Sequence, residues 1–278
     1  MPEGKIVKAL SGFYYVQTEQ GLFQCRGRGV FRKKKISPLV GDDVEFEQSN
    51  PGEGYIINVK SRKNQLIRPP IANIDQAIIV VSAMEPEFSS LLLDRFLVLV
   101  ESVDIEPLIF ISKMDMVDEL DNSKIIEYKE DYQNIGYAVE MVSTKQLGNL
   151  EQIVHHFKDK ISVIAGQSGV GKSSLLNAIN PTLNLETNQI STSLGRGKHT
   201  TRHVELIEIN GGLVADTPGF SSLEFSEIEL ENLSSCFPEM LGRQSNCKFR
   251  GCLHNKEPKC AVKQAVENHK IPRYRYEH

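Results

Sequence analysis

The pattern of hydrophobic and polar positions changes character along the chain, and the first change comes near residue 68. From Gly4 to about Arg68 the apolar positions form short runs separated by turn residues, which predicts strands at 13–16, 22–26, 44–47 and 55–59. About five short strands in so small a region favour a closed barrel, because closure removes exposed strand edges. The stiff segment Arg68-Pro69-Pro70 follows, so we expect an all-β OB-type barrel over 1–68.

Longer apolar runs then alternate with helical patterns between residues 69 and 226. The expected strands are 76–83, 107–112, 139–143, 161–165 and 212–215, and the expected helices are 91–101, 124–134 and 150–160. This alternation is typical of an α/β domain with a largely parallel sheet and helices on both faces. From Glu227 the strands cease and Pro and Cys enter, which predicts a mainly α-helical third domain over 227–278 without a large core of its own.

Composition limits the class of protein. The chain has 278 residues, 40% hydrophobic and 24% charged, with a formal net charge of −4, close to the averages of soluble globular proteins. Its apolar runs stay short of the roughly 20 residues that a membrane helix needs, and its start lacks the apolar core of a signal peptide. We therefore expect a cytoplasmic, monomeric protein without membrane contact.

A glycine-rich segment lies between the strand at 161–165 and a helix expected to begin at Ser173. It reads Gly166-Gln167-Ser168-Gly169-Val170-Gly171-Lys172-Ser173, followed by Ser174, and matches G-x-x-x-x-G-K-S. In such a loop the backbone N–H groups surround phosphates, the lysine reaches the outer phosphates and the last serine binds Mg²⁺. A chance glycine-rich turn is the alternative, and the strand–loop–helix context argues against it.

Two later segments fit the same phosphate site. Asp216-Thr217-Pro218-Gly219 closes the strand at 212–215, where Asp216 could hold magnesium through water and the Gly219 amide could sense the terminal phosphate. The polar stretch 195–201, Gly-Arg-Gly-Lys-His-Thr-Thr, ends in Thr200 and Thr201, either of which could complete the magnesium shell. We favour Thr201, so the predicted magnesium ligands are Ser173, Thr201 and Asp216.

The segment Ser112-Lys113-Met114-Asp115 has the groups that recognise guanine. One carboxylate, Asp115, can accept from the ring N–H and the exocyclic amine, and the stem of Lys113 can cover the base. Ser112 replaces the usual asparagine, which predicts a shortened link to the phosphate loop and weaker nucleotide binding. Ser143-Thr144-Lys145 could place a backbone amide at the guanine oxygen, so GTP or GDP with Mg²⁺ is the expected ligand. A surface ion pair between Lys113 and Asp115 is the alternative.

The base-reading segments come before the phosphate loop in this chain, whereas in ras-like GTPases they follow it. This order predicts a circularly permuted GTPase whose Asp216–Gly219 turn adjoins the C-terminal domain. Ras-like enzymes have a water-orienting glutamine shortly after this turn. In this chain Phe220 follows the turn directly, and the next glutamine is Gln244. We expect His199 to position the attacking water beside Lys172 and Thr201, with slow intrinsic hydrolysis that a partner stimulates.

Metal ligands and cations mark the two ends of the chain. Three thiols and one imidazole, Cys247, Cys252, His254 and Cys260, suit one structural Zn²⁺ with tetrahedral geometry, with disulfide pairing as the alternative. Near the N-terminus, Phe31 and two glycines accompany six cations on an expected barrel loop: Arg26, Arg28, Arg32, Lys33, Lys34 and Lys35. Such a loop predicts contact with RNA phosphates, and a solvated charge run is the alternative.

Taken together, these motifs resemble the bacterial ribosome small-subunit-dependent GTPase A family, with its OB barrel, permuted GTPase and Cys-x4-Cys-x-His-x5-Cys zinc domain. The resemblance covers nearly the whole chain, and residues 195–201 resemble the family's switch loop. It implies late maturation of the 30S subunit, contact with 16S rRNA, subunit-stimulated hydrolysis of GTP to GDP, and release of an assembly factor.

Two other interpretations compete with this one. A P-loop ATPase or kinase is the first, and Asp115 argues for GTP over ATP. The second is an RNA-binding adaptor that uses nucleotide only as a switch, and hydrolysis stimulated by 30S subunits would separate an enzyme from such an adaptor.

Overall fold

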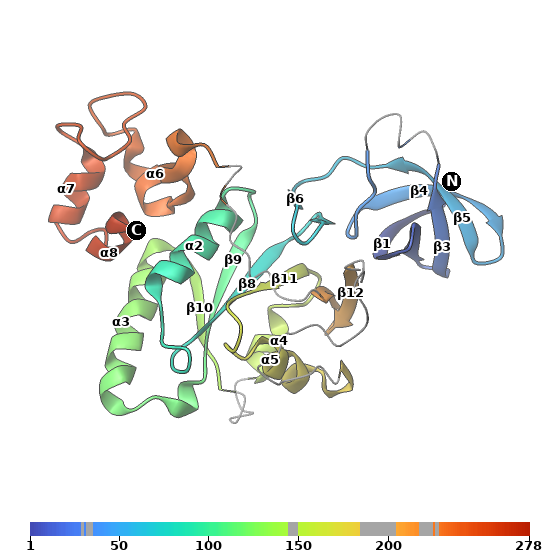
Figure 1. Ribbon diagram of the computed structural model, residues 1–278, viewed down its shortest axis with the longest axis horizontal. Helices are drawn as coiled ribbons and strands as arrows, with labels where there is room; N and C mark the ends of the chain where they lie inside the picture. The colour runs from blue at the N-terminus through green and yellow to red at the C-terminus, as the bar shows by residue number, and fades with distance from the viewer. Residues whose placement is uncertain (29–30, 32–35, 144–149, 184–203, 217–224, 226–227) are drawn as a thin grey trace.

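The computed structural model describes residues 1–28, 31, 36–143, 150–183, 204–216, 225 and 228–278. Figure 1 shows three bodies in succession along the long axis: a strand barrel with the N-terminus, a central α/β body, and a helical body with the C-terminus. Within these described ranges, every helix is too short or too polar to cross a membrane.

The N-terminal barrel closes through both antiparallel and parallel pairs. Its strands are β1 (Glu3–Leu10), β2 (Phe13–Thr18), β3 (Gly21–Gly27), β4 (Asp43–Asn50) and β5 (Glu53–Val59). Strands β1, β2 and β3 pair in chain order, β3 pairs in parallel with β5, and β4 pairs with both β5 and β1. Alternate side chains such as Ile6, Val16 and Phe46 point inward and are fully buried. The predicted barrel is confirmed, and β1 adds a strand that the sequence pattern did not reveal.

The central body is a mostly parallel sheet with the strand order β10-β9-β8-β11-β13-β12. Its strands are β8 (Gln76–Ser82), β9 (Glu106–Ser112), β10 (Ala138–Met141), β11 (Ile161–Ala165), β12 (Val204–Ile209) and β13 (Gly212–Asp216). Its helices are α2 (Ser90–Glu101), α3 (Glu119–Ile135), α4 (Leu150–His155) and α5 (Lys172–Ile179), with short 3₁₀ turns η1 (Met114–Met116) and η3 (Pro181–Leu183). Only β12 runs antiparallel to its neighbour β13 among these described strands.

Helices cover both faces of this sheet, as the alternation predicted. Phe96 of α2 and Tyr132 of α3 pack with Ile79 and Ile109 on one face. On the other face, α4 and α5 contribute to a second cluster that contains Ile78, Phe110 and Leu175. Helix α4 is shorter than the predicted 150–160, because the chain turns after His155 and Asp159 adopts a left-handed conformation with φ of 57°.

The C-terminal body is helical and has a small core. It contains the 3₁₀ helix η4 (Leu230–Cys236) and the helices α6 (Pro238–Gln244), α7 (Ala261–Glu267) and α8 (Arg273–Glu277). Phe237, Met240, Val262 and Ile271 form its buried cluster, and Val98 of α2 belongs to the same cluster. The expected mainly α-helical domain is confirmed, and its core is shared with the central body.

The barrel meets the central body through a short linker and one strand edge. Strands β6 (Gln65–Leu66) and β7 (Ile71–Ala72) form a hairpin against the barrel, where the Ala72 N–H donates to Val40 O at 2.9 Å. Arg62 donates to both carboxylate oxygens of the buried Asp42, at 2.7 and 2.8 Å. Strand β1 also pairs with β12, so one eleven-stranded sheet runs through both bodies. The boundary expected at 68/69 falls in the hairpin turn, and both domain boundaries stay predictions.

The helical body meets the central body through buried charges. Arg275 of α8 is 1% exposed and donates to Asp94 of α2 at 2.5 Å and to Glu239 of α6 at 2.7 and 3.0 Å. Tyr132 of α3 donates to the same Asp94 carboxylate at 2.6 Å. The guanidinium also lies over the Phe237 ring, 4.7 Å from its centroid. One arginine therefore joins three helices from two bodies.

Candidate functional site

The phosphate-loop segment lies at the carboxyl end of β11 and leads into α5. Gly166 has a φ of 141°, and a Cβ there would lie 2.2 Å from Val80 O, so only glycine fits between β11 and β8. Gly171 caps α5 with a φ of 92°. Because α5 begins at Lys172, the N–H groups of its first turn, which includes Ser173 and Ser174, are available to bind an anion.

Lys172 folds back onto its own loop. Its Nζ donates to Gly166 O at 2.7 Å and to Gln167 O at 2.8 Å. Burial lowers the pKa of Lys172 to about 8, because the two carbonyls compensate only part of the lost hydration. Arriving phosphates would offer this ammonium stronger acceptors than neutral carbonyl groups.

Ser112 links the base-reading segment to the phosphate loop. It ends β9, is buried, and its Oγ lies 2.6 Å from Val170 O and 3.1 Å from Val81 O. A hydroxyl has one proton, so it donates to one carbonyl at a time. The link that we expected to be weakened is thus made by the shorter side chain, because β8, β9 and β11 hold their carboxyl ends close together. Whether nucleotide binding is weaker stays a prediction.

The other base-reading residues surround the same end of the sheet. Lys113 adopts a left-handed conformation with φ of 60° and starts η1, and its Nζ donates to Glu85 O. Ser143, after β10, donates its hydroxyl to Asp115 Oδ1 at 2.9 Å. This bond fixes one carboxylate oxygen of Asp115. The pair of Asp115 and Ser143 joins the ends of β9 and β10 at the position expected for a base.

Residues of the loop after β8 also border this site, although no motif in the sequence marks them. Glu85 supplies the carbonyl that holds Lys113, and a Cβ on Gly169 would lie 3.9 Å from Pro86 Cδ. The position of this loop indicates such a role, because ligands gather at the carboxyl ends of parallel strands and β8 lies between β9 and β11 in the sheet.

Several predicted residues lie outside the described ranges. These are Thr144, Lys145, His199, Thr200, Thr201 and Gly219. Asp216 ends β13, and its backbone is the register partner of Glu205 in β12. The roles of these residues in magnesium binding and hydrolysis stay predictions.

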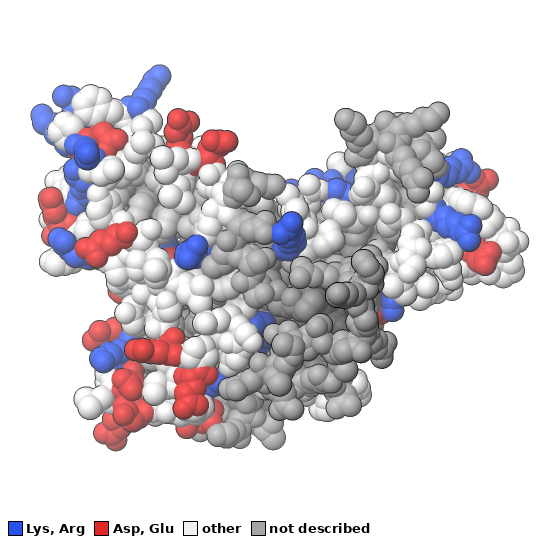
Figure 2. All heavy atoms as spheres, viewed as in Figure 1, with Lys and Arg blue, Asp and Glu red and all other residues white. Residues whose placement is uncertain are grey.

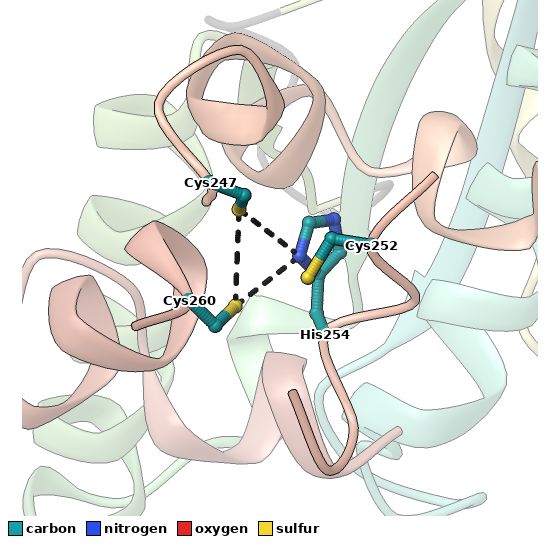
Figure 3. A group of neighbouring side chains, drawn as sticks. All are labelled: Cys247, Cys252, His254 and Cys260. Carbon is teal, nitrogen blue, oxygen red and sulfur yellow. Dashed lines mark hydrogen bonds between the residues drawn. The ribbon is translucent and has the colours of Figure 1, made fainter. Parts of the chain in front are cut away.

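The four predicted metal ligands come together in the C-terminal body (Figure 3). Their ligand atoms all lie within 4.8 Å of one another. Cys247 Sγ lies 3.9 Å from Cys260 Sγ and 3.6 Å from His254 Nδ1, and His254 Nδ1 lies 3.3 Å from Cys260 Sγ. A tetrahedral ion with bonds of about 2.3 Å to sulfur and about 2.0 Å to nitrogen requires ligand separations of about 3.5–3.8 Å. The cluster could therefore hold a metal ion, and all of its cysteines are free thiols.

The surroundings of the cluster act on its protonation in different directions, since burial raises the pKa of the Cys252 thiol to about 11. Burial lowers the pKa of His254, which keeps the imidazole neutral. Burial raises the pKa of Cys247, but backbone hydrogen bonds from Ala261 and Val262 outweigh it, so the pKa of this thiol is lowered. Tyr276 of α8 donates to His254 O at 2.6 Å and ties the loop to the last helix. Neutral imidazole and deprotonated thiols are the forms that coordinate metals.

The basic barrel segment is described in part. Phe31 is 7% exposed and belongs to the barrel core, so it does not offer a free ring for base stacking. Its apolar surface is better buried than left in water. Arg26 lies in β3 over the Phe13 ring at 4.8 Å, and Arg28 pairs with Glu47. Arg32 and Lys33, Lys34 and Lys35 lie outside the described ranges.

Charged side chains are unevenly distributed over the face shown in Figure 2. Asp and Glu gather along α3, whereas Lys and Arg stand out on the outer part of the C-terminal body. A partner with negative charge would meet repulsion along α3 and attraction at the C-terminal body.

Comparison with known proteins identifies the family. A family model described as RsgA GTPase matches residues 59–226, and one described as RsgA N-terminal domain matches residues 3–56. The chain belongs to the RsgA GTPase family. Small ribosomal subunit biogenesis GTPase RsgA of Bacillus subtilis (strain 168) is 62% identical, covering 100% of this chain and 95% of that protein. The protein of that name from Geobacillus sp. (strain WCH70) is 64% identical, covering 100% and 94%.

Two solved structures agree with this assignment. The crystal structure of YloQ, described as a circularly permuted GTPase, has a TM-score of 0.86 at 57% identity and covers 100% of this chain and 92% of that one. YjeQ from Thermotoga maritima has a TM-score of 0.87 at 42% identity, covering 99% and 94%. The chain is therefore a GTPase, and the predicted circular permutation is confirmed. As an RsgA-family GTPase it uses Mg²⁺ with its nucleotide.

Proposed function

We propose that this protein hydrolyses GTP in late maturation of the small ribosomal subunit and that the 30S subunit stimulates the hydrolysis. Full-length identity of 62% to a small ribosomal subunit biogenesis GTPase carries this proposal. The geometry supports its nucleotide part, because Ser112 joins the end of β9 to the phosphate loop and the Ser143–Asp115 hydrogen bond joins the ends of β10 and β9.

The nucleotide would be held from both ends. Asp115 and Lys113 would bind guanine, with Ser143 placing an amide at its oxygen, while the N–H groups of the Gly166–Ser174 loop would surround the phosphates. Lys172 would exchange its carbonyl partners for phosphate oxygens. Ser173, Thr201 and Asp216 would hold Mg²⁺, and the Gly219 amide would contact the terminal phosphate.

Hydrolysis needs an oriented water molecule. His199 would position that water for in-line attack on the terminal phosphorus, so that the bond to the bridging oxygen breaks and GDP leaves with inorganic phosphate.

The C-terminal body would bind a metal ion, and the barrel would bind RNA. One structural Zn²⁺ would fill the Cys247–Cys260 cluster, because thiolate and imidazole ligands at tetrahedral separations suit zinc. The barrel cations, namely Arg26, Arg28, Arg32, Lys33, Lys34 and Lys35, would contact 16S rRNA phosphates. We further propose three domains at 1–68, 69–226 and 227–278, a monomeric state and a cytoplasmic location.

Purified 30S subunits provide the direct test. The GTP hydrolysis rate should rise many-fold on adding 30S subunits and remain near its basal value with 50S subunits or free RNA. Equal rates in all three conditions would remove the subunit from the proposed function while leaving the nucleotide site intact.

Base specificity is tested at Asp115. Asp115→Asn should lose GTP affinity by about 100-fold, because an amide cannot accept from both guanine donors. It should gain affinity for xanthosine triphosphate, whose carbonyl can accept from the new amide. Asp121→Asn, an exposed acid in α3, is the matched control and should bind GTP normally. Unchanged GTP preference in Asp115→Asn would contradict the assignment.

A further inference from the structure

The turn after β8 holds the base-reading lysine through a backbone carbonyl. Lys113 Nζ donates to Glu85 O, and Lys113 is the residue whose stem would cover the base. Glu85 and Lys113 both have left-handed backbones, with φ of 50° and 60°. Such a conformation costs a residue other than glycine free energy, and it persists where surrounding contacts hold it. Contacts on both sides of the turn must therefore keep the Glu85 carbonyl in place.

The first side of the turn is held by the strand ends of the sheet. The Ala83 N–H donates to Ser112 O at 3.0 Å, which ties the chain after β8 to the end of β9. Pro86 lies beside the phosphate loop, since a Cβ on Gly169 would lie 3.9 Å from Pro86 Cδ. The turn at residues 84–87 thus sits between the two halves of the nucleotide site.

An aromatic contact holds the other side of the turn. The Phe88 ring packs on Tyr128 of α3, with ring centroids 4.7 Å apart and an angle of 35° between the rings. Tyr128 in turn meets Tyr274 of α8 edge to face at 5.3 Å. All three rings are partly buried against the main hydrophobic core. Aromatic pairs of this kind stabilise a structure beyond the burial of their surface, so the Phe88 ring has a fixed seat.

The kind of contact at Lys113 gives this seat its importance. The Glu85 side chain is exposed, and the carbonyl of Glu85 is the group that binds the lysine. The position of Lys113 therefore depends on the path of the backbone. Phe88 lies three residues after Glu85 and two residues before α2, so its ring fixes that path.

We propose that Phe88 is a positioning residue for guanine binding, which packs on Tyr128, holds the turn at residues 84–87 and so keeps Lys113 where its stem covers the base. The inference rests on the proposed function for the role of Lys113. It goes beyond that function in naming the side chain that places the lysine.

Substitutions on both sides of the aromatic contact test this proposal. The variants are Phe88→Ala, the conservative Phe88→Tyr, Tyr128→Ala, Lys113→Ala, and the double variant of Phe88→Ala with Lys113→Ala. Leu91→Ala is the matched control, because Leu91 is an apolar residue of the first turn of α2 and is 48% exposed. The Kd for GDP and the basal KM and kcat for GTP are measured for each purified full-length protein.

Phe88→Ala and Tyr128→Ala should each raise the Kd for GDP and the KM for GTP by about 3- to 10-fold. The kcat should stay within about 2-fold, because a contact with the base is equally strong before and during phosphoryl transfer. Phe88→Tyr keeps the ring and should retain normal affinity, as should Leu91→Ala. In the double variant the loss should be no larger than in Lys113→Ala, since Phe88 acts through that lysine.

A merely structural role of Phe88 predicts a different pattern, in which the losses of Phe88→Ala and Lys113→Ala add. Additive losses would overturn the proposal, and so would normal GDP binding by Phe88→Ala when Lys113→Ala binds weakly. Should Phe88→Ala not fold, Phe88→Leu, which keeps apolar volume without the ring, enters the same comparison. Unchanged GDP affinity in Lys113→Ala would remove the base-reading role of the lysine together with this inference. Absent stimulation by 30S subunits would remove only the ribosomal part of the proposed function.

Discussion

The barrel and the C-terminal body are joined to the same GTPase by opposite kinds of contact. The barrel edge holds β12 by a short ladder and the half-exposed pair of Lys8 and Glu205. The C-terminal body is held by Arg275, whose bonds to Asp94 and Glu239 are fully buried. Both contacts involve ion pairs, yet their cost of opening differs greatly.

This difference follows from hydration. An exposed ion pair exchanges its partner for water at a cost of about 0–1 kcal/mol, whereas removing one member of a buried pair costs about 3–5 kcal/mol. The barrel side is therefore suited to opening during function, and the C-terminal side is suited to holding α2 and α3 against the metal-binding body. Five experiments test this difference between the two junctions.

The largest effect is expected from removing the metal. A chelator should strip the Cys247, Cys252, His254 and Cys260 cluster and release the small helical core, because the metal supplies folding free energy that so few apolar residues cannot. Hydrogen exchange should accelerate by more than about 100-fold in α6 and α7 and stay unchanged in β2 and β3. Cys236→Ala, a buried thiol outside the cluster, should still retain the metal. Unchanged exchange in α7 would show that the body folds without metal.

Arg275→Leu should follow in size. It leaves the carboxylates of Asp94 and Glu239 buried without their cation, at a cost of about 3–5 kcal/mol in the free energy of unfolding. Denaturant unfolding measures this loss. Arg273→Leu on the same helix removes an exposed pair with Glu277 and should change stability by less than about 0.5 kcal/mol. Equal losses of stability in the two variants would contradict a special role for the buried contacts of Arg275 with Asp94 and Glu239.

Asp42→Asn probes the buried polar contact on the barrel side. Asp42 is fully buried and receives hydrogen bonds from Arg62 and from the Leu39 N–H. The amide removes one acceptor and the charge, so we expect a loss of about 1–3 kcal/mol in thermal or denaturant unfolding. Asp43→Asn, whose partner Lys5 is partly exposed, serves as the control and should lose less. A loss of unfolding free energy as large as that of Arg275→Leu would show that the Asp42–Arg62 contact stabilises the protein as much as the buried Arg275 contact does.

Lys8→Ala should hardly affect stability. The partly exposed pair with Glu205 contributes about 0–1 kcal/mol, so the melting temperature should fall by no more than about 2–4 °C. A loss of unfolding free energy above about 2 kcal/mol would mean that the Lys8–Glu205 contact stabilises the protein in the way that the buried Arg275 contact does.

The smallest expected effect is on the pH dependence of GTP affinity. The pKa of Lys172 is lowered to about 8 by burial, and bound phosphates favour the protonated ammonium, so binding takes up a proton above pH 8. GTP affinity should therefore fall as the pH rises through about 8. Lys8→Glu and Arg275→Leu should keep the same midpoint, because neither side chain touches Lys172. A shifted midpoint of this pH dependence in either variant would show that the substituted contact affects the environment of Lys172.

Local signals in the sequence predicted much of this molecule. The Gly166–Ser173 loop follows from its glycines and lysine, and the buried runs at β8, β9 and β11 follow from continuous apolar residues. The β-branched and apolar residues of Val204–Ile209 are typical of a strand, but the period-2 alternation breaks at Ile207, so β12 is only weakly marked in the sequence. Ser112 was expected to weaken the link to the phosphate loop, but the distance between strand ends decides that link.

Contacts between distant segments could not be predicted from local patterns. Nothing in residues 3–10 shows that β1 pairs with β12, and nothing near Arg275 shows that two carboxylates from other helices enclose it. Phe31 is a further example: its position among cations does not show that burial of its apolar surface places it in the barrel core.

The pairing of β1 with β12 also governs the order in which the chain can be completed during synthesis. Lys8 and Glu205 are separated by 197 positions, so the barrel emerges long before its partner strand exists. Until then the end of β1 at Lys8 and Ala9, beyond its pairs with β4, presents an unpaired edge, which is a template for association with other chains. Lys8 places a positive charge on that edge, and a nascent chain that lacked it should aggregate more readily.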